Sequence, residues 1–111
     1  MNEMQLKTIA LKKLAPHPRA ANVMPEERQT KLAANIQHTD VYQPPVVRSN
    51  PDKNGHYQIL DGASRVAALK TLGHKEAQCV VLDVDDAKAE LLLATFNSLR
   101  GTENPYRRAM L

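Results

Sequence analysis

The residues with the clearest capacity for chemistry in this chain stand in the segment Asp61-Gly62-Ala63-Ser64-Arg65. An apolar run of β type stops at Gly62, and residues of good helix propensity follow it. The first backbone N–H groups of a helix have no acceptor within the helix, and the helix dipole adds partial positive charge at the same end. A phosphate or another anion fits such a junction. Gly62 allows close approach of the backbone, Ser64 offers a hydroxyl donor, and Arg65 offers a guanidinium that grips phosphate oxygens in pairs.

A tight turn that binds nothing is the alternative for this segment, with Arg65 as an ordinary surface side chain. Strand-to-helix turns that contain glycine are common. Asp61 directly precedes the turn, and two roles are open to it: it positions a sugar hydroxyl or a metal-bound water, or it stabilises the turn itself. The elements around the turn are therefore needed to decide between a phosphate site and a turn that binds nothing.

Length and composition are those of one globular domain. The 111 residues suffice for a single modest core, and 42% apolar and 24% charged residues are ordinary values. No apolar run is long enough to cross a bilayer, and the first residues lack the apolar stretch of a secretory signal, so we expect a cytoplasmic protein with no membrane partner. The formal net charge of +3 permits contact with nucleic acid without requiring it. The single cysteine, Cys79, excludes an internal disulfide and a cysteine-based zinc site, and its apolar surroundings predict a buried, inert thiol.

Apolar periodicity and turn residues predict strands and helices in alternation. Strands are expected at residues 6–11, 45–48, 56–60 and 77–82, and helices at 25–38, from 62 to just before 73, and from 85 or 86 to 101. The turn-forming residues between the second and third strands predict a hairpin-like return. This pattern predicts the α/β (α+β) class, with a small mixed sheet covered by helices.

The same periodicity predicts which side chains are buried. The expected apolar faces consist of Leu32, Ala33 and Ile36 in one helix and Val66, Ala67, Leu69 and Leu72 in the next. The four histidines lack the i, i+3 or i, i+4 pairing of a metal site, so we expect them at the surface. His17 lies between two prolines near Arg19 and is a candidate contact for DNA or a nucleotide. The acidic residues Asp83, Asp85 and Asp86 are expected to cap the helix that follows, with a metal site as the alternative.

Four segments occur in the order and spacing of one family, and the chain resembles the ParB/sulfiredoxin-like domain over roughly residues 6 to 108. The segments are Leu14-Ala15-Pro16-His17-Pro18-Arg19, Tyr42-Gln43-Pro44-Pro45-Val46-Val47-Arg48, Tyr57 to Leu69, and Asn97-Ser98-Leu99-Arg100-Gly101. The resemblance implies the fold of that family. Its members include the N-terminal domain of ParB partition proteins, which binds CTP with magnesium, the sulfiredoxins, which use ATP, and proteins labelled ParB-like nucleases.

The resemblance also implies a nucleotide site. Gly62 and Arg65 match the phosphate-binding turn of the family, and Gln43 matches the Gln-Pro pair beside the nucleotide. Asn97 and Arg100 match the asparagine and arginine of the ParB motif that lies against the triphosphate. The implied phosphate-binding residues are Gln43, Gly62, Ala63, Ser64, Arg65, Asn97 and Arg100, with Asp61 as an auxiliary candidate.

Two positions depart from the family pattern. Ala63 stands where a sulfiredoxin has its catalytic cysteine and where ParB proteins have a glutamate. Phe96 stands where ParB proteins have a second, metal-associated glutamate. Without a thiolate at position 63 the chain lacks the nucleophile of a sulfiredoxin. Without the two carboxylates, binding of Mg²⁺ and hydrolysis are both in doubt, so the question of an enzymatic activity stays open.

These observations lead to three hypotheses for the function. The first is a nucleotide-binding regulatory domain (CTP or ATP) of a ParB-like, DNA-associated protein of chromosome or plasmid partition. The second is a ParB-like nuclease or a nucleotide-dependent phosphotransferase, and the third is a scaffold that binds DNA or protein and keeps a vestigial site. Residues 1–111 are expected to form a single domain, the N-terminal part of a longer protein, because Asn104-Pro105 begins another helix near the end of the sequence. DNA binding is expected mainly from regions outside this fragment, and a homodimer is an open alternative.

Overall fold

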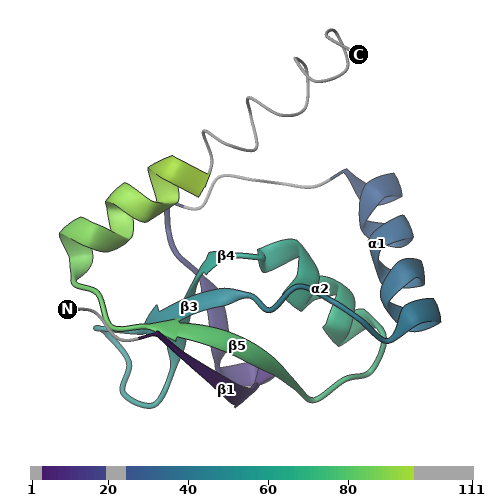
Figure 1. The fold of residues 1–111 in the computed structure, drawn as a ribbon, viewed down its shortest axis with the longest axis horizontal. Coiled ribbons are helices and arrows are strands. Elements are labelled where there is room, and N and C mark those ends of the chain that lie inside the picture. Colours follow the sequence, from purple (N-terminus) through teal and green to yellow (C-terminus); the bar gives the residue numbers. More distant parts are fainter. Residues whose placement is uncertain (1–3, 20–24, 97–111) are drawn as a thin grey trace, which may run out of the picture.

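A computed structural model of the chain describes residues 4–19 and 25–96, and Figure 1 shows how they fold. The elements are β1 (Met4–Ala10), the 3-10 helix η1 (Leu11–Lys13), β2 (Leu14–Pro16), α1 (Glu26–Thr39), β3 (Val46–Ser49), β4 (Tyr57–Asp61), α2 (Ala63–Thr71) and β5 (Glu76–Leu82), followed by a helix over residues 86–96. The predicted strands and helices are therefore confirmed within the described residues. Residues 97–101 of the last of these helices, and the further helix expected to begin at Asn104-Pro105, lie outside the described residues.

The five strands form one mixed sheet in the order β1-β5-β3-β4-β2. β3 and β4 pair antiparallel, as the turn residues between them predicted, and β1 pairs antiparallel with β5. β3 also pairs parallel with β5, and β2 pairs parallel with β4. The predicted mixed sheet covered by helices is therefore confirmed.

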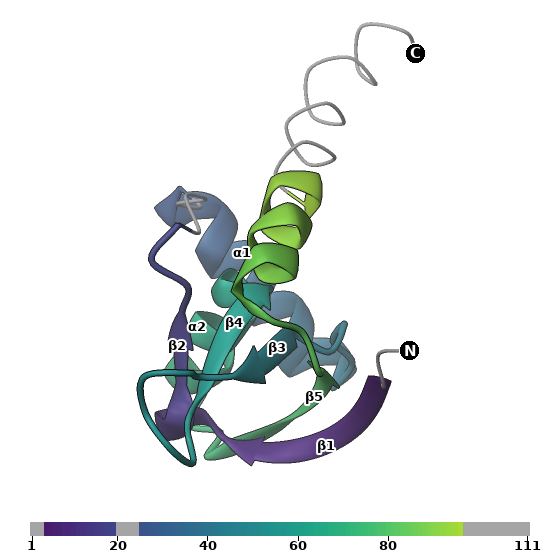
Figure 2. The ribbon, with the colours of Figure 1, turned by 90° about the vertical axis from the view of Figure 1, so that its left-hand side faces the viewer.

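Helices cover both faces of the sheet. Successive strand residues point to opposite faces, so Ile59 joins one apolar cluster and Leu60 the other. The main core cluster lies on the face covered by α1 and α2, with Ile36 of α1 and Leu69 of α2 among its buried residues. The second cluster, which we call the Leu60 cluster, lies under helix 86–96 and has Leu60, Ala89 and Leu93 as its buried members. Figure 2 shows helix 86–96 in front of the sheet and α1 and α2 behind it.

The predicted apolar faces are largely correct, with one error. Ile36 is buried, and Leu32 and Ala33 pack against the main core cluster. Ala67, however, is exposed, and Ala68 is fully buried instead. The helical period shows that Val66 and Leu69 lie on the buried face of the helix, but it does not show whether Ala67 or Ala68 is buried beside them. The neighbouring elements decide which of the two is buried.

Among the described residues, no helix combines the length and the apolar character needed to cross a membrane.

Cys79 tests the packing of the main core cluster. Its side chain is buried, and burial raises the pKa of the thiol to about 11. The thiolate is the reactive form, so at pH 8 Ellman's reagent should react with the folded chain about 100-fold more slowly than with the chain unfolded in urea. Equal rates in both conditions would contradict this packing.

Candidate functional site

The turn at Gly62 joins β4 directly to α2. Gly62 has φ 103° and ψ 22°, a left-handed conformation that favours glycine, and its carbonyl accepts the Val66 amide at 3.0 Å as the first bond of the helix. No side chain of the described residues caps this end of α2. The amides of the first helical turn therefore point out of the helix beside the turn, as the sequence predicted.

A second constraint on Gly62 is its close packing against Pro45. A Cβ atom at position 62 would lie 3.1 Å from the Cα and 3.2 Å from the Cβ of Pro45. Pro45 is itself fully buried, and its carbonyl accepts the Val80 amide at 2.8 Å. The turn thus lies against backbone that the sheet already fixes, and a Cβ at position 62 would require Pro45 to shift by a few tenths of an ångström.

Arg65 folds back over the turn. Its Nη1 lies 2.9 Å from the point where a Cβ of Gly62 would be, and its Nη2 donates to Gln43 Oε1 at 2.7 Å. This bond to the carboxamide of Gln43 orients the guanidinium over the turn. The structure thus brings Gln43, Gly62 and Arg65 together from a loop, a turn and a helix.

The neighbouring predicted residues lie in the same region with different roles. The backbone carbonyl of Ser64 accepts Gln29 Nε2 at 2.8 Å, which ties the first turn of α2 to α1. Ala63 packs against the main core cluster. Asp61 is half-buried and pairs with Val46 in the β3–β4 ladder, next to an irregularity in the register. The predicted clamp residues Asn97 and Arg100 lie outside the described residues.

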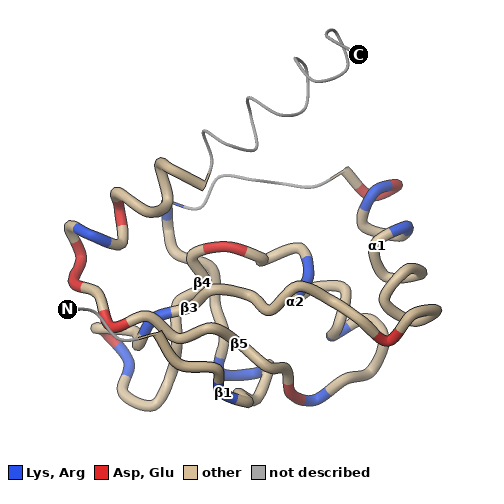
Figure 3. The backbone as a smooth tube through the Cα atoms, in the orientation of Figure 1, with Lys and Arg blue, Asp and Glu red and all other residues tan. Residues whose placement is uncertain are grey.

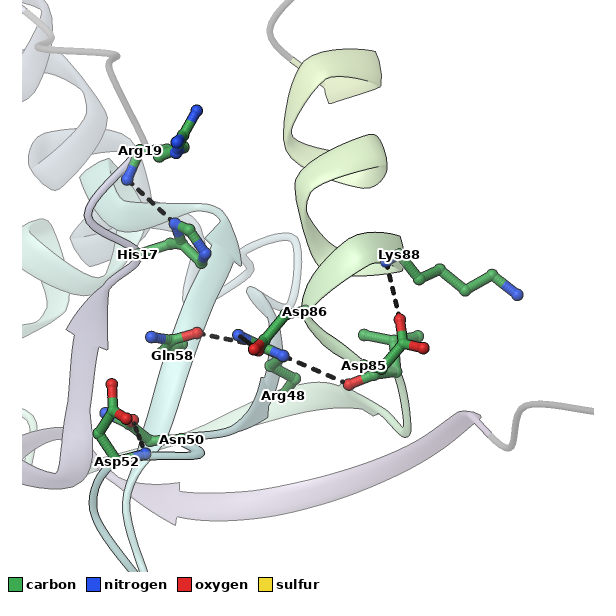
Figure 4. A network of polar contacts seen from close by, with 10 residues as sticks. His17, Arg19, Arg48, Asn50, Asp52, Gln58, Asp85, Asp86 and Lys88 are labelled. Atoms are coloured by element: carbon green, nitrogen blue, oxygen red, sulfur yellow. Dashed lines mark hydrogen bonds and ion pairs between the residues drawn. The ribbon is translucent and has the colours of Figure 1, made fainter.

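A polar network that the sequence analysis did not identify lies under the start of helix 86–96 (Figure 4). Arg48 is buried, and its Nε donates to Gln58 Oε1 at 2.9 Å. Its Nη2 lies 2.8 Å from Asp86 Oδ1, and its Nη1 donates to the Val84 carbonyl at 3.5 Å. A signal for this network exists in the sequence, since Arg48 and Gln58 are polar residues on two apolar strands joined by a hairpin turn.

His17 belongs to the same region, and the predicted surface position is wrong. Its side chain is buried, and Nδ1 accepts the backbone N–H of Arg19 at 3.0 Å, so it is not placed as a surface contact for DNA or a nucleotide. Burial lowers the pKa of His17, and the positive charge of Arg48 lowers it further, while the carboxylate of Glu90 opposes the shift. Nδ1 as an acceptor corresponds to neutral histidine with its proton on Nε2.

The acidic residues before and within helix 86–96 stabilise its beginning. Asp85 Oδ1 accepts the Lys88 amide at 2.9 Å, the cap that the sequence predicted. Figure 3 shows acidic positions gathered around the start of this helix, where the helix dipole favours negative charge. Within residues 4–19 and 25–96, no three His, Cys, Asp or Glu side chains are grouped as metal ligands would be.

Comparison with known proteins finds a matching protein family, sequence relatives and solved structures of similar fold. Residues 1–97 match the ParB N-terminal domain. Over 110 residues the chain is 33% identical to the probable chromosome-partitioning protein ParB of Vibrio cholerae, covering 96% of this chain and 36% of that protein. The chain spans about a third or less of the length of the ParB relatives that it matches.

Solved structures agree with the sequence matches. The C-terminally truncated ParB of Caulobacter crescentus complexed with CTP-gamma-S is similar with a TM-score of 0.76 at 28% identity, over 84% of this chain and 52% of that one. The same protein complexed to the centromeric parS site gives a TM-score of 0.66 at 26% identity, over 78% and 43% of the two chains. Sulfiredoxin of Arabidopsis thaliana shares the fold, with a TM-score of 0.64 at 17% identity, over 80% and 97%.

Replacing Gly62 with alanine should destabilise the chain by two effects. The left-handed conformation costs roughly 1–2 kcal/mol for a residue with a Cβ, and the contact with Pro45 adds to that. Gly73→Ala is the matched control, since Gly73 has φ 88° and a Cβ there would meet nothing within 4 Å. In urea denaturation we expect Gly62→Ala to cost at least about 1 kcal/mol more than Gly73→Ala. Equal costs would contradict the close approach.

His17 should make the stability depend on pH. Its folded-state pKa lies below the ordinary value of 6.5, so the unfolded chain binds more protons in that range. The free energy of unfolding should therefore fall as the pH is lowered through and below 6.5. His17→Asn keeps an acceptor for the Arg19 amide and should reduce that fall in urea titrations at pH 5–7.5. The same substitution at the exposed His74 is the control for replacing a histidine as such, and a variant of His17 with the wild-type pH profile would refute the assignment.

Proposed function

Because the chain belongs to the ParB N-terminal domain family, we propose that it is a nucleotide-binding regulatory domain of a ParB-like, DNA-associated protein. In this proposal, the turn from Gly62 to Arg65 holds the phosphates of CTP or ATP. The observation that carries it is the position of the Arg65 guanidinium, folded over Gly62 and oriented by Gln43.

The chemistry of the turn favours a phosphate over other ligands. Outward-pointing amides and the positive end of the α2 dipole attract an anion, and the closely packed Gly62 leaves no side chain to obstruct it. Arg65 supplies a positively charged, planar guanidinium at the same place, and this group matches phosphate oxygens in geometry. Ser64 adds a hydroxyl, and Asn97 and Arg100 are proposed to complete the site.

The relatives support this choice of ligand. A ParB of similar fold carries CTP-gamma-S, and the same protein has been seen on its centromeric DNA site. For this chain, contact with DNA is proposed through regions outside the 111 residues, and a homodimer and a cytoplasmic location stay predictions.

The described residues do not fit the magnesium that the family implies. Ala63 packs against the main core cluster, and Phe96 packs against the Leu60 cluster, so both glutamate positions of the family are occupied by apolar packing residues. Mg²⁺ prefers carboxylate and phosphate oxygens, and Asp61 is the one carboxylate within the segment 61–65. We therefore propose binding of the nucleotide without a metal held by the protein, and we propose no hydrolysis.

Removing the Arg65 guanidinium should weaken binding of the nucleotide. Calorimetry with CTP and ATP should show Arg65→Ala losing about 1.5 kcal/mol or more of binding free energy, the scale of a charge-assisted hydrogen bond. Lys70→Ala removes an exposed cation from the other end of the same helix and should leave the affinity within about twofold of wild type.

A thermal-shift panel of ATP, CTP, GTP and UTP, each with and without Mg²⁺, identifies the nucleotide. A ligand at a hundred times its Kd adds about 2.7 kcal/mol of stability, which is readily measured. Equal affinities for wild type and Arg65→Ala would reject this site. A panel without any response would favour the scaffold with a vestigial site.

A further inference from the structure

Helix 86–96 packs as a unit separate from the main core cluster. The buried members of the main core cluster come from the strands, η1, α1 and α2. Helix 86–96 instead contributes Ala89 and Leu93 to the Leu60 cluster, which has three buried residues. Moving this helix away from the sheet would therefore expose the Leu60 cluster and leave the main core cluster intact.

The polar contacts that hold this helix meet at Arg48. The guanidinium reaches the Val84 carbonyl just before the helix and the Asp86 carboxylate in its first turn, at 3.5 Å and 2.8 Å. From the sheet, Gln58 accepts a third bond at 2.9 Å. Another ion pair, between Arg19 and Glu90, is 3.6 Å long and has both side chains largely exposed, so it contributes little.

The two partners of the main pair differ sharply in exposure. The side chain of Arg48 is 5% exposed, whereas that of Asp86 is 75% exposed. Helix 86–96 therefore covers the guanidinium of Arg48. Among the described residues, the one carboxylate close to that guanidinium belongs to Asp86, which lies at the surface. A buried charge that loses its partner is strongly destabilising, because its remaining neutral acceptors do not replace its hydration. Lifting the first turn of the helix is the move that rehydrates Arg48 without disturbing the main core cluster.

We propose that Arg48 and Asp86 form a latch that decides whether helix 86–96 is docked on the sheet, and that this helix opens as a unit of its own. One consequence rests on the proposed function. Asn97 follows this helix directly in the sequence, so we expect docking of the helix to affect binding of the nucleotide as well. Arg48 and Asp86 themselves are positioning residues and are not assigned contact with the nucleotide.

Hydrogen exchange on the 111-residue chain tests the latch. In Asp86→Asn, exchange of the amides in residues 90–96 should rise by about tenfold or more, while exchange in α2 stays at the wild-type rate. Asp85→Asn is the matched control, since it makes the same chemical change one residue away and asparagine keeps the cap on the Lys88 amide. Its exchange rates should stay within about threefold of wild type.

A double variant separates the buried charge from a general loss of helix stability. Arg48→Met together with Asp86→Asn leaves no buried cation to hydrate, so exchange in residues 90–96 should return most of the way to wild type. Equal effects of Asp85→Asn and Asp86→Asn, no recovery in the double variant, or a rise in α2 exchange together with that of the helix would each overturn the latch.

The affinity for CTP, measured in the same variants, is a second readout. If the proposed function holds, Asp86→Asn should weaken binding and the double variant should restore it. A wild-type chain that binds no nucleotide would reject the proposed function, while the exchange experiment would still judge the latch.

Discussion

The contact between Gly62 and Pro45 is the constraint on which the candidate site depends. Pro45 is held by its hydrogen bond to Val80 of β5, and Gly62 lies so close to it that a Cβ at position 62 would make tight contacts of 3.1 and 3.2 Å with Pro45. This contact joins the loop that carries Gln43 to the turn that begins α2. Because this contact brings the two backbones together, the guanidinium of Arg65 reaches Gln43 Oε1 at 2.7 Å over the turn.

Strand alternation divides the molecule into two packing units that share one sheet. Odd and even residues of β4 point to opposite faces, so the large core under α1 and α2 and the small cluster under helix 86–96 begin at adjacent positions, Ile59 and Leu60. The small unit buries little apolar surface and relies in addition on the charge of Arg48. A unit of this kind is expected to open locally at a lower free energy than the main core, as elements that move in proteins commonly do.

The departures from the family pattern have a physical explanation in the packing. Ala63 and Phe96 are both partly buried and pack against apolar clusters, where an apolar side chain suits the surroundings better than a carboxylate does. Phe96, which stands where the family resemblance implies a metal-associated glutamate, thus serves packing in this chain, while the glycine turn and its arginine form the site that we propose for a phosphate. We therefore propose that this member of the family binds a nucleotide without hydrolysing it.

The sequence by itself determined the elements, because apolar periods, prolines and glycines act locally: the strand–Gly62–helix junction, the β3–β4 hairpin and the Asp85 cap all follow from neighbours along the chain. It also indicated that Gln43, Gly62 and Arg65 belong to one site, through resemblance. Only the tertiary structure decided that His17 and Arg48 are buried and that Ala68 replaces Ala67 in the core. Those outcomes depend on which elements, distant in the sequence, pack against each residue. A local period carries no information about such neighbours.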